Sequence, residues 1–475
     1  MPRFLNYVVL TPFYTNIFSV EQYGIVTNLY AYVVFLLILL TYGLETGYFR
    51  FTKSEEQPRK VYSTIMASLF TSTMLFVVII LIFNPSIARM LEYPDRRYLI
   101  ILFSMVVAID AFSAVPFAKL RFEEKAKKFG YLKIFNVVVN LFFNFLFFIA
   151  FPWLIQQAGF GFLDAVYDPS IGVGYVFVSN LLASFFTLLL LLPEINVSVG
   201  LIDPALLKRI LKYSMPLLVV GLAGTINEVA DKELIKRLVP DDEQPMRQLG
   251  IYGANYKLGM LMTIFIQMFR YAAEPFYFSK MKDYDAREVY SRVMRYFVLF
   301  GLLIFLVVML YLDVFKWFIA EKHHTGLHVV PIILIANLFL GVNYNLSIWY
   351  KLSNLTRFGA VISLVGAGIT LGMNFLLVPI YGYEGSAWAT LICYFSMMVI
   401  SYFMGRAHYK IPYTVGSIAF YTVLALGIWF ITKQIHYPAI FYKYLFNSLF
   451  LLAFIGVVFV KEKIKLKDVR AFLGR

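Results

Sequence analysis

The stretch VYSTIMASLFTSTMLFVVIILIF, residues 61–83, decides the class of fold. It holds no charged residue, and about 20 apolar residues are enough to span the hydrocarbon core of a bilayer as a helix. A spanning segment has to satisfy its own backbone N–H and C=O groups, and this run lacks the short alternating pattern of an outer-membrane strand. The stretch therefore predicts a transmembrane helix.

Similar apolar runs recur along the chain, separated by short polar or Pro/Gly-rich breaks. Of the 475 residues, 60% are hydrophobic and 15% are charged, whereas a soluble domain has about 25% charged residues. This composition excludes a soluble enzyme, a disordered protein and a disulfide scaffold. We predict an all-α membrane protein with about 14 transmembrane helices. The predicted spans lie at 1–18, 23–49, 61–83, 98–118, 131–155, 171–193, 210–230, 250–278, 293–319, 328–350, 358–380, 385–405, 413–432 and 440–460.

Lysine and arginine are distributed unevenly between the breaks. If the N-terminus faces the cytoplasm, the cytoplasmic breaks contain 29 of the 42 basic residues and the opposite breaks contain 11. The positive-inside rule then predicts that both termini are cytoplasmic. This distribution also accounts for the net charge of +14, so we expect no nucleic acid as a partner.

Two segments of the sequence resemble each other at equivalent spans. YGIV at residues 23–26 opens the second predicted span, and LGIY at residues 249–252 opens the eighth. Matching spans are six apart and have the same orientation, which predicts a parallel duplication with a substrate site between the halves. Chance similarity between apolar segments is the alternative.

The duplication predicts the domain organisation. Helices 1–6 would form an N-terminal lobe at residues 1–200, and helices 7–12 a C-terminal lobe at residues 201–410. Two additional helices and a basic cytoplasmic tail would occupy residues 411–475.

Several basic side chains fall inside predicted spans. A charge near the bilayer centre costs at least about 2.5–3.5 kcal/mol, so it usually faces a cavity or a partner. Cations on the first, second and eighth spans therefore predict a cavity for a phosphate-bearing substrate, because Arg binds phosphate oxygens in a bidentate manner. The predicted substrate-binding residues are Arg3, Arg50, Lys257 and Arg270.

Each of these cations also has a structural interpretation. Arg50 and Arg270 lie near the ends of their spans, where long side chains can reach the lipid headgroups as interfacial anchors. Lys257 lies deeper, and its alternative is an ion pair with Glu228 or Asp231.

Acidic side chains inside the spans are candidates for coupling transport to an ion. Asp110 is the deepest. It could relay a proton or bind a cation, or it could be a protonated acid bonded to a neighbouring helix. The sequence has no GxxxxGK[ST] loop for ATP, so we expect an ion gradient or the membrane potential to drive transport. We expect no cofactor and no metal, because His324 and His328 lack further ligands. The coupling candidates are Asp110, Glu45, Glu228, Asp231 and Glu274.

Short motifs follow one another in a fixed order from the start of the chain to the eighth span. They are LTPFYT at 10–15, EQYGI at 21–25, GLET at 43–46, FRF at 49–51, PFAKLR at 116–121, KAKKF at 125–129, YSMP at 213–216 and GIY at 250–252. Their order and spacing resemble bacterial polysaccharide flippases of the Wzx type. The resemblance covers nearly the whole chain.

This resemblance implies the fold of the multidrug/oligosaccharidyl-lipid/polysaccharide exporter superfamily, with two helix bundles in a V shape. It implies a non-enzymatic flippase that moves undecaprenyl-pyrophosphate-linked oligosaccharide across the bacterial inner membrane by alternating access, for polysaccharide biosynthesis. The implied partners are this substrate, membrane lipids, a polysaccharide polymerase and assembly proteins.

The resemblance also carries over to particular positions. Arg3, Arg50 and Lys257 match basic positions on the family's helices 1, 2 and 8. Family members usually have about a dozen more residues at the start, so we expect a truncated first helix or a true N-terminus upstream of Met1.

Other functions would require different features of the sequence. A multidrug antiporter of the same fold would favour an acidic, aromatic cavity, and a peptidoglycan-precursor flippase would share the same architecture. A membrane-bound polymerase or ligase would need a sizeable outer loop with a nucleophile and a base, which the sequence lacks. A scaffold in an assembly complex would not need charges inside its spans.

Overall fold

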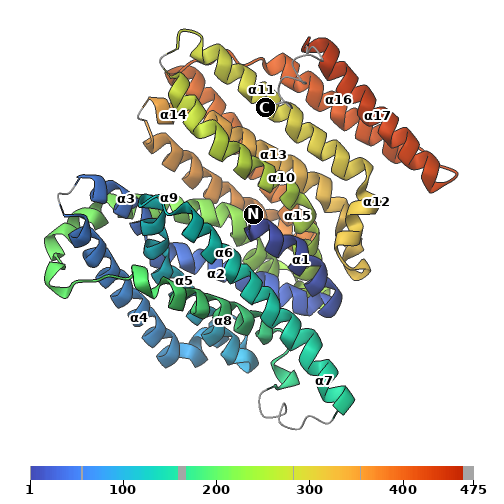
Figure 1. The fold of residues 1–475 in the computed structure, drawn as a ribbon. Coiled ribbons are helices and arrows are strands. Elements are labelled where there is room, and N and C mark those ends of the chain that lie inside the picture. Colours follow the sequence, from blue (N-terminus) through green and yellow to red (C-terminus); the bar gives the residue numbers. More distant parts are fainter. Residues whose placement is uncertain (1, 55–56, 159–166, 282, 354, 464–475) are drawn as a thin grey trace. The chain divides into compact units, whose positions relative to one another are not determined.

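The computed structural model describes residues 2–54, 57–158, 167–281, 283–353 and 355–463. Within these ranges the chain is almost entirely helical and contains no strand (Figure 1). The predicted all-α membrane fold is therefore confirmed. Most of the predicted basic tail, residues 464–475, lies outside the described residues.

Among the described residues, 11 helices are long and apolar enough to cross a membrane. One of them, α15 (Arg357–His408), contains two predicted spans that meet at Gly382, where φ is 54°. The predicted first and eighth spans form α1 (Pro2–Ile17) and α10 (Pro245–Lys280), which are not among the 11. Helix α1 has 16 residues, and charged residues are spread along α10. The number of 14 spans stays a prediction.

Gly382 is held in its unusual conformation by a neighbouring side chain. The backbone N–H of Tyr383 donates a hydrogen bond of 3.0 Å to Oε1 of Gln248, and a Cβ at Gly382 would lie 2.1 Å from the same oxygen. Glycine is therefore required both for the positive φ and for the space.

The first compact unit covers Met1–Ala254 and Ser363–Ser386. Besides α1 and parts of α10 and α15, its helices are α2 (Val20–Thr41), α3 (Leu44–Ser54), α4 (Pro58–Met90), α5 (Arg97–Phe122), α6 (Ala126–Phe145), α7 (Phe151–Ala158), α8 (Gly174–Leu191) and α9 (Pro204–Leu238). Helix α4 packs on α5, and α8 packs on both α5 and α6.

Local chemistry explains where two of these helices begin. Ser19 caps α2 in a capping box, because its Oγ accepts from the N–H of Gln22 while the Gln22 side chain accepts from the N–H of Ser19. Asp203 caps α9, and its carboxylate lies 2.7 Å from Nζ of Lys60. The hydrogen bond from Lys60, with those from the helix N–H groups, lowers the pKa of Asp203 to about 2.

The second predicted span, 23–49, lies within the candidate span Val20–Lys53, but this span contains a break. The helix is broken after α2, because Tyr42 and Gly43 both have positive φ, at 32° and 74°. Helix α3 then begins at Leu44, and it packs with α4 and α9 around a core that includes Ile65 and Ile210. Glu45 and Arg50 therefore belong to a separate short helix.

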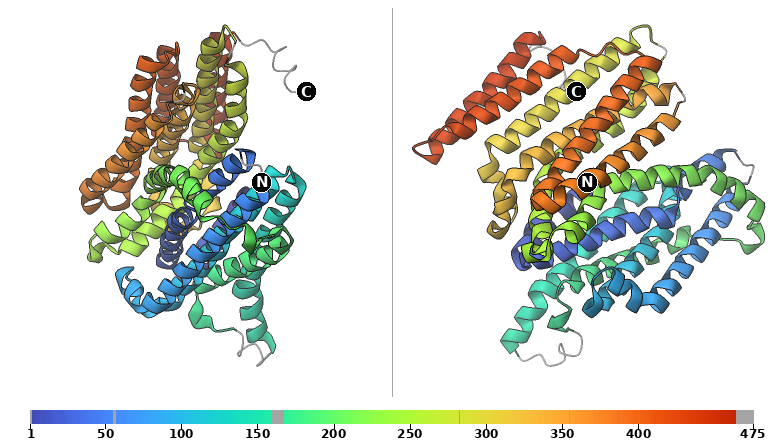
Figure 2. Two further views of the ribbon diagram at one scale, coloured as in Figure 1. Left: turned by 90° about the vertical axis from the view of Figure 1, so that its left-hand side faces the viewer. Right: turned by 180° about the vertical axis from the view of Figure 1, so that it is seen from behind.

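The second compact unit covers Asn255–Ile362 and Ala387–Arg475. Its helices, besides parts of α10 and α15, are α11 (Ala286–Leu310), α12 (Leu312–Phe315), α13 (Val330–Leu346), α14 (Ile348–Leu352), α16 (Val415–Gln434) and α17 (Ile440–Lys461). Helix α11 packs on α13, α16 and α17, and α16 and α17 run side by side (Figure 2).

These units are defined by packing, whereas the lobes at 1–200, 201–410 and 411–475 are defined by the sequence repeat. The lobe boundaries stay a prediction.

Candidate functional site

The two segments matched by the sequence repeat cross each other at very close range. A Cβ on Gly24 of α2 would lie 2.1 Å from the carbonyl oxygen of Met246, and one on Gly250 of α10 would lie 1.9 Å from that of Val20. Met246 lies four residues before Gly250, and Val20 lies four residues before Gly24. Each glycine therefore faces the carbonyl group four residues before the other glycine. The crossing is therefore symmetric, and small residues are what allow two helix backbones to approach so closely.

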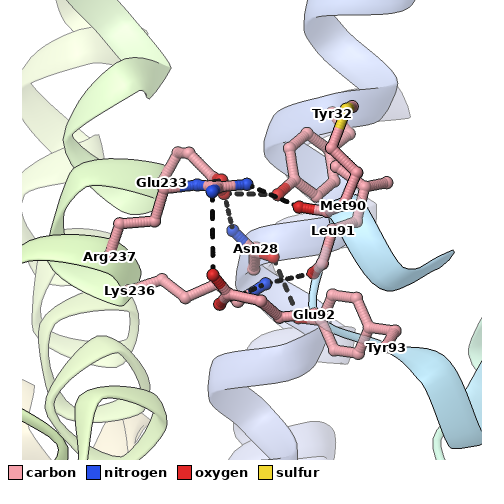
Figure 3. A network of polar contacts seen from close by, with 9 residues as sticks. All are labelled: Asn28, Tyr32, Met90, Leu91, Glu92, Tyr93, Glu233, Lys236 and Arg237. Carbon is pink, nitrogen blue, oxygen red and sulfur yellow. Dashed lines mark hydrogen bonds and ion pairs between the residues drawn. The ribbon is translucent and has the colours of Figure 1, made fainter. Parts of the chain in front are cut away.

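A network of polar side chains begins one turn further along α2 and joins it to the end of α9 (Figure 3). The carboxylate of Glu233 on α9 accepts hydrogen bonds from Nδ2 of Asn28, at 3.0 Å, and from the hydroxyl of Tyr32. Nε of Arg237 donates to the other oxygen of the same carboxylate. Oδ1 of Asn28 accepts from the hydroxyl of Tyr93, at 2.9 Å. One carboxylate thus gathers donors from both helices.

Lys236 ties the same end of α9 to the turn that follows α4 (Figure 3). Its side chain is 3% exposed. Nζ donates to the carbonyl oxygen of Leu91, lies 3.4 Å from the carboxylate of Glu92 and lies 4.3 Å from the centre of the Tyr93 ring. Arg237 reaches the same turn through the carbonyl oxygen of Met90, at 3.0 Å. The buried cation is compensated from three directions, as a charge removed from water requires.

We call Asn28, Tyr32, Met90, Leu91, Glu92, Tyr93, Glu233, Lys236 and Arg237 the polar lock. The sequence analysis missed it, because polar residues at the ends of spans resemble ordinary loop residues. A usable signal was present in the spacing of Glu233, Lys236 and Arg237, which lie at i, i+3 and i+4 on one helix face.

Two predicted coupling residues lie on α9 just before the lock. Asp231 is buried, and its carboxylate accepts from Nζ of Lys232, at 2.8 Å, and from the hydroxyl of Tyr252, at 2.7 Å. Tyr252 belongs to the repeat motif on α10. Glu228 is exposed. Asp231 is therefore ion-paired within α9 and joined to α10 by a hydrogen bond.

The other predicted residues of the first unit are dispersed. Oδ1 of Asp110 on α5 accepts a 2.7 Å hydrogen bond from Oγ of Ser184 on α8. Glu45 forms an ion pair of 2.6 Å with Arg121. Arg50 is exposed and stacks on a tyrosine ring of α9. Arg3 falls among residues whose side chains lie outside the described part.

In the second unit, a pocket opens between α10 and the junction of α13 with α14. It brings together the predicted residues Arg270 and Glu274, which lie one turn apart on α10. Nζ of Lys351 on α14 donates a 2.8 Å hydrogen bond to Glu274, and the guanidinium of Arg270 lies 5.0 Å from the ring centre of Tyr344. Two cations and one carboxylate leave this lining positively charged.

The floor of this pocket offers an unused donor. Asn345 on α13 accepts a hydrogen bond from the hydroxyl of Tyr277, but its buried Nδ2 has no partner within the described residues. An anionic oxygen in the pocket would satisfy it. We call Arg270, Glu274, Tyr277, Asn345 and Lys351 the α10 pocket.

Lys257 lies elsewhere on α10. It is half-buried and 13 residues before Arg270, which corresponds to about 20 Å along a helix. The structure thus places Arg270 and Glu274 in one pocket, and Lys257 lies about 3.6 helical turns before Arg270, outside the α10 pocket.

Comparison with known structures shows which fold this is. An inward-facing multidrug resistance MATE family transporter of the MOP superfamily matches with a TM-score of 0.65 at 12% identity, over 86% of this chain and 93% of that one. The lipid II flippase MurJ, in an inward closed conformation, matches with a TM-score of 0.64 at 12% identity, over 96% of this chain and 99% of that one. The chain therefore has the fold of these transporters.

Comparison with protein families is more specific. No curated protein matches the chain by sequence. The model of one family, described as polysaccharide biosynthesis protein, matches residues 3–282. That range contains the repeat crossing, the polar lock and the α10 half of the pocket. By this match across more than half of its length, the chain belongs to the polysaccharide biosynthesis protein family, whose Wzx-type members its motifs resemble.

Proposed function

We propose that this protein flips a lipid-linked oligosaccharide with a pyrophosphate headgroup, of the undecaprenyl type, across the bacterial inner membrane. The observation that carries the proposal is the positively charged lining of the α10 pocket in a chain of a polysaccharide biosynthesis family. Its cavity is about 20 Å³, so the pocket would have to widen during the transport cycle to admit a pyrophosphate. Arg270 and Lys351 supply positive charge, and Asn345 supplies an unused amide donor. Charge-assisted hydrogen bonds of this kind suit the oxygens of a pyrophosphate.

The repeat crossing and the polar lock support a mechanism of alternating access. With both termini in the cytoplasm, the start of α2 and the end of α9 lie at the outer face of the membrane. We propose that crossing and lock close this outer end while the saccharide and pyrophosphate enter from the cytoplasmic side. The polyprenyl tail would remain in the lipid throughout.

Asp110 is the acid that best suits ion coupling. Glu45, Asp231 and Glu274 each form an ion pair with a lysine or an arginine. Asp110 instead accepts a hydrogen bond from a serine hydroxyl, a partner that can serve either protonation state. We therefore expect Asp110→Asn to weaken the dependence of transport on an ion gradient.

Translocation of the lipid-linked saccharide in vesicles tests the proposal. Arg270→Gln should slow translocation at least about tenfold, because it removes a cation from the α10 pocket. Lys257→Ala, outside that pocket on the same helix, should slow it as much if phosphate is also attracted at this second position. Lys257→Glu should be at least as slow, since it replaces attraction by repulsion. Lys53→Gln, which removes an exposed cation from α3, is the matched control and should transport normally.

Folding has to be separated from transport in this experiment. Each variant should therefore keep the melting temperature of the parent protein. Normal translocation by well-folded Arg270→Gln and Lys257→Ala, or rescue by Lys257→Glu, would exclude phosphate attraction as the basis of transport.

A further inference from the structure

A second pocket in the second unit lies where α15 ends and α16 begins. Its cavity of about 450 Å³ shares no lining residue with the α10 pocket. The charged residues in its lining are Arg406 and Lys410, and Thr414 lies at the start of α16. Four aromatic side chains, Trp349, Tyr402, Tyr409 and Tyr413, complete the wall.

No acid among the described residues compensates the charge of this cavity. Arg406 and Lys410 are both exposed, and the described part of the chain places no carboxylate within 4.0 Å of either. Elsewhere cations are commonly neutralised, as at Glu194, whose carboxylate lies within 4.0 Å of three lysines. Two cations on one cavity without an acid favour an anionic ligand.

The start of α16 adds polar groups that also favour an anion. Thr414 occupies the N-cap position without making a side-chain cap bond, and its buried Oγ1 has no hydrogen-bond partner among the residues described. Val415 and Gly416, the first residues of the helix, also line the cavity. The N–H of Val415 already donates to the carbonyl oxygen of Tyr413, at 2.9 Å. The first turn is still the positive end of the helix dipole, which favours an anion.

The linker that shapes the cavity is held firmly. Oγ of Ser291 on α11 donates a 2.7 Å hydrogen bond to the carbonyl oxygen of Pro412, and Ile411 is buried. The guanidinium of Arg287 lies 4.8 Å from the ring centre of Tyr409. Gly405 lies so close to Trp349 that a Cβ would come within 2.7 Å of the ring. A preformed cavity costs little to organise when a ligand binds.

We propose that this cavity binds the phosphate of an anionic phospholipid from the cytoplasmic leaflet. The proposal rests on the proposed membrane orientation, which places the linker at the cytoplasmic face. Tyrosine and tryptophan prefer the membrane interface, and basic pockets between transmembrane helices on this side bind anionic headgroups. The bound lipid would be a resident of the protein, separate from the transported substrate.

Native mass spectrometry of the full-length protein in detergent tests this site. With phosphatidylglycerol, the parent protein should retain a lipid that Arg406→Gln/Lys410→Gln binds at least about thirtyfold more weakly, since two charge-assisted contacts are lost. Thr414→Val, which removes one hydroxyl, should weaken binding less. Lys53→Gln/Lys127→Gln removes two exposed cations from the first unit and should bind normally.

Two competitors distinguish the source of the phosphate. Phosphatidylcholine, which carries a phosphate but no net charge, should not be retained, and millimolar inorganic pyrophosphate should not displace phosphatidylglycerol. Equal retention by Arg406→Gln/Lys410→Gln, equal binding of phosphatidylcholine, or displacement by pyrophosphate would each overturn the proposal. Because binding is measured without transport, this result is independent of whether the protein is a flippase.

Discussion

Gly250→Ala is expected to lose most of its transport activity, although it adds a single methyl group. The new Cβ would lie 1.9 Å from the carbonyl oxygen of Val20, so α2 and α10 would have to move apart. Overpacking of this kind costs about 1–3 kcal/mol, which shifts a two-state equilibrium about 5–150-fold. We therefore expect the population of the conformation in which α2 and α10 touch at Gly24 and Gly250 to fall by the same factor.

Cross-linking reports this arrangement independently of transport. Glu21 and Arg247 form an ion pair of 3.1 Å across the same crossing, so a Glu21→Cys/Arg247→Cys pair should cross-link readily. Replacing Cys393, the single native cysteine, by serine removes competing thiols. Adding Gly250→Ala should reduce the yield.

The chain provides a matched control for the glycine. A Cβ at Gly224 on α9 would meet no heavy atom within 4 Å, so Gly224→Ala should leave cross-linking and translocation unchanged. Normal cross-linking and transport in Gly250→Ala would show that the close crossing has no role in the cycle.

Glu233→Ala is expected to open the polar lock. It removes the shared acceptor of Asn28, Tyr32 and Arg237, and groups left without partners in a buried site are costly. We expect the closed conformation to lose about 2–4 kcal/mol of stability. The loss is no larger because the Glu233 side chain is 23% exposed, so water can satisfy part of the unpaired groups. The same cysteine pair, with the melting temperature, measures the effect.

A double-mutant cycle identifies the cause of this loss. In Glu233→Ala/Arg237→Ala the combined loss should be smaller than the sum of the single losses, because both changes break the same contact. Asp242→Asn, an exposed acid after α9, should have no effect. Additive losses, or an equal effect of Asp242→Asn, would contradict a lock centred on Glu233.

Much of the fold could be predicted from the sequence, because a membrane-spanning chain has few alternatives to the helix. The run at residues 61–83 lies within α4. The break at Tyr42 and Gly43 could not be predicted, since the apolar pattern continues through it and positive φ leaves no mark on hydropathy. Likewise, the meeting of Gly24 with Gly250 needs coordinates, although the repeat identified both motifs.

The candidate site was predicted in part. Arg270 and Glu274 are charged residues on an apolar span and could be recognised one by one. Lys351 and Asn345 complete the same pocket from 71 to 81 residues further along the chain, where nothing in the local sequence points to α10. The polar lock was missed for the same reason, because its members come from three separate segments.

Transport of two lipids that differ in a single group tests the central claim most directly. Both would carry the same polyprenyl tail and saccharide, joined by pyrophosphate in one and by a neutral linker in the other. In vesicles containing the purified protein, we predict protein-dependent translocation of the pyrophosphate lipid and little of the neutral one, with Arg270→Gln abolishing the difference. Equal translocation of both lipids by the parent protein would contradict the account.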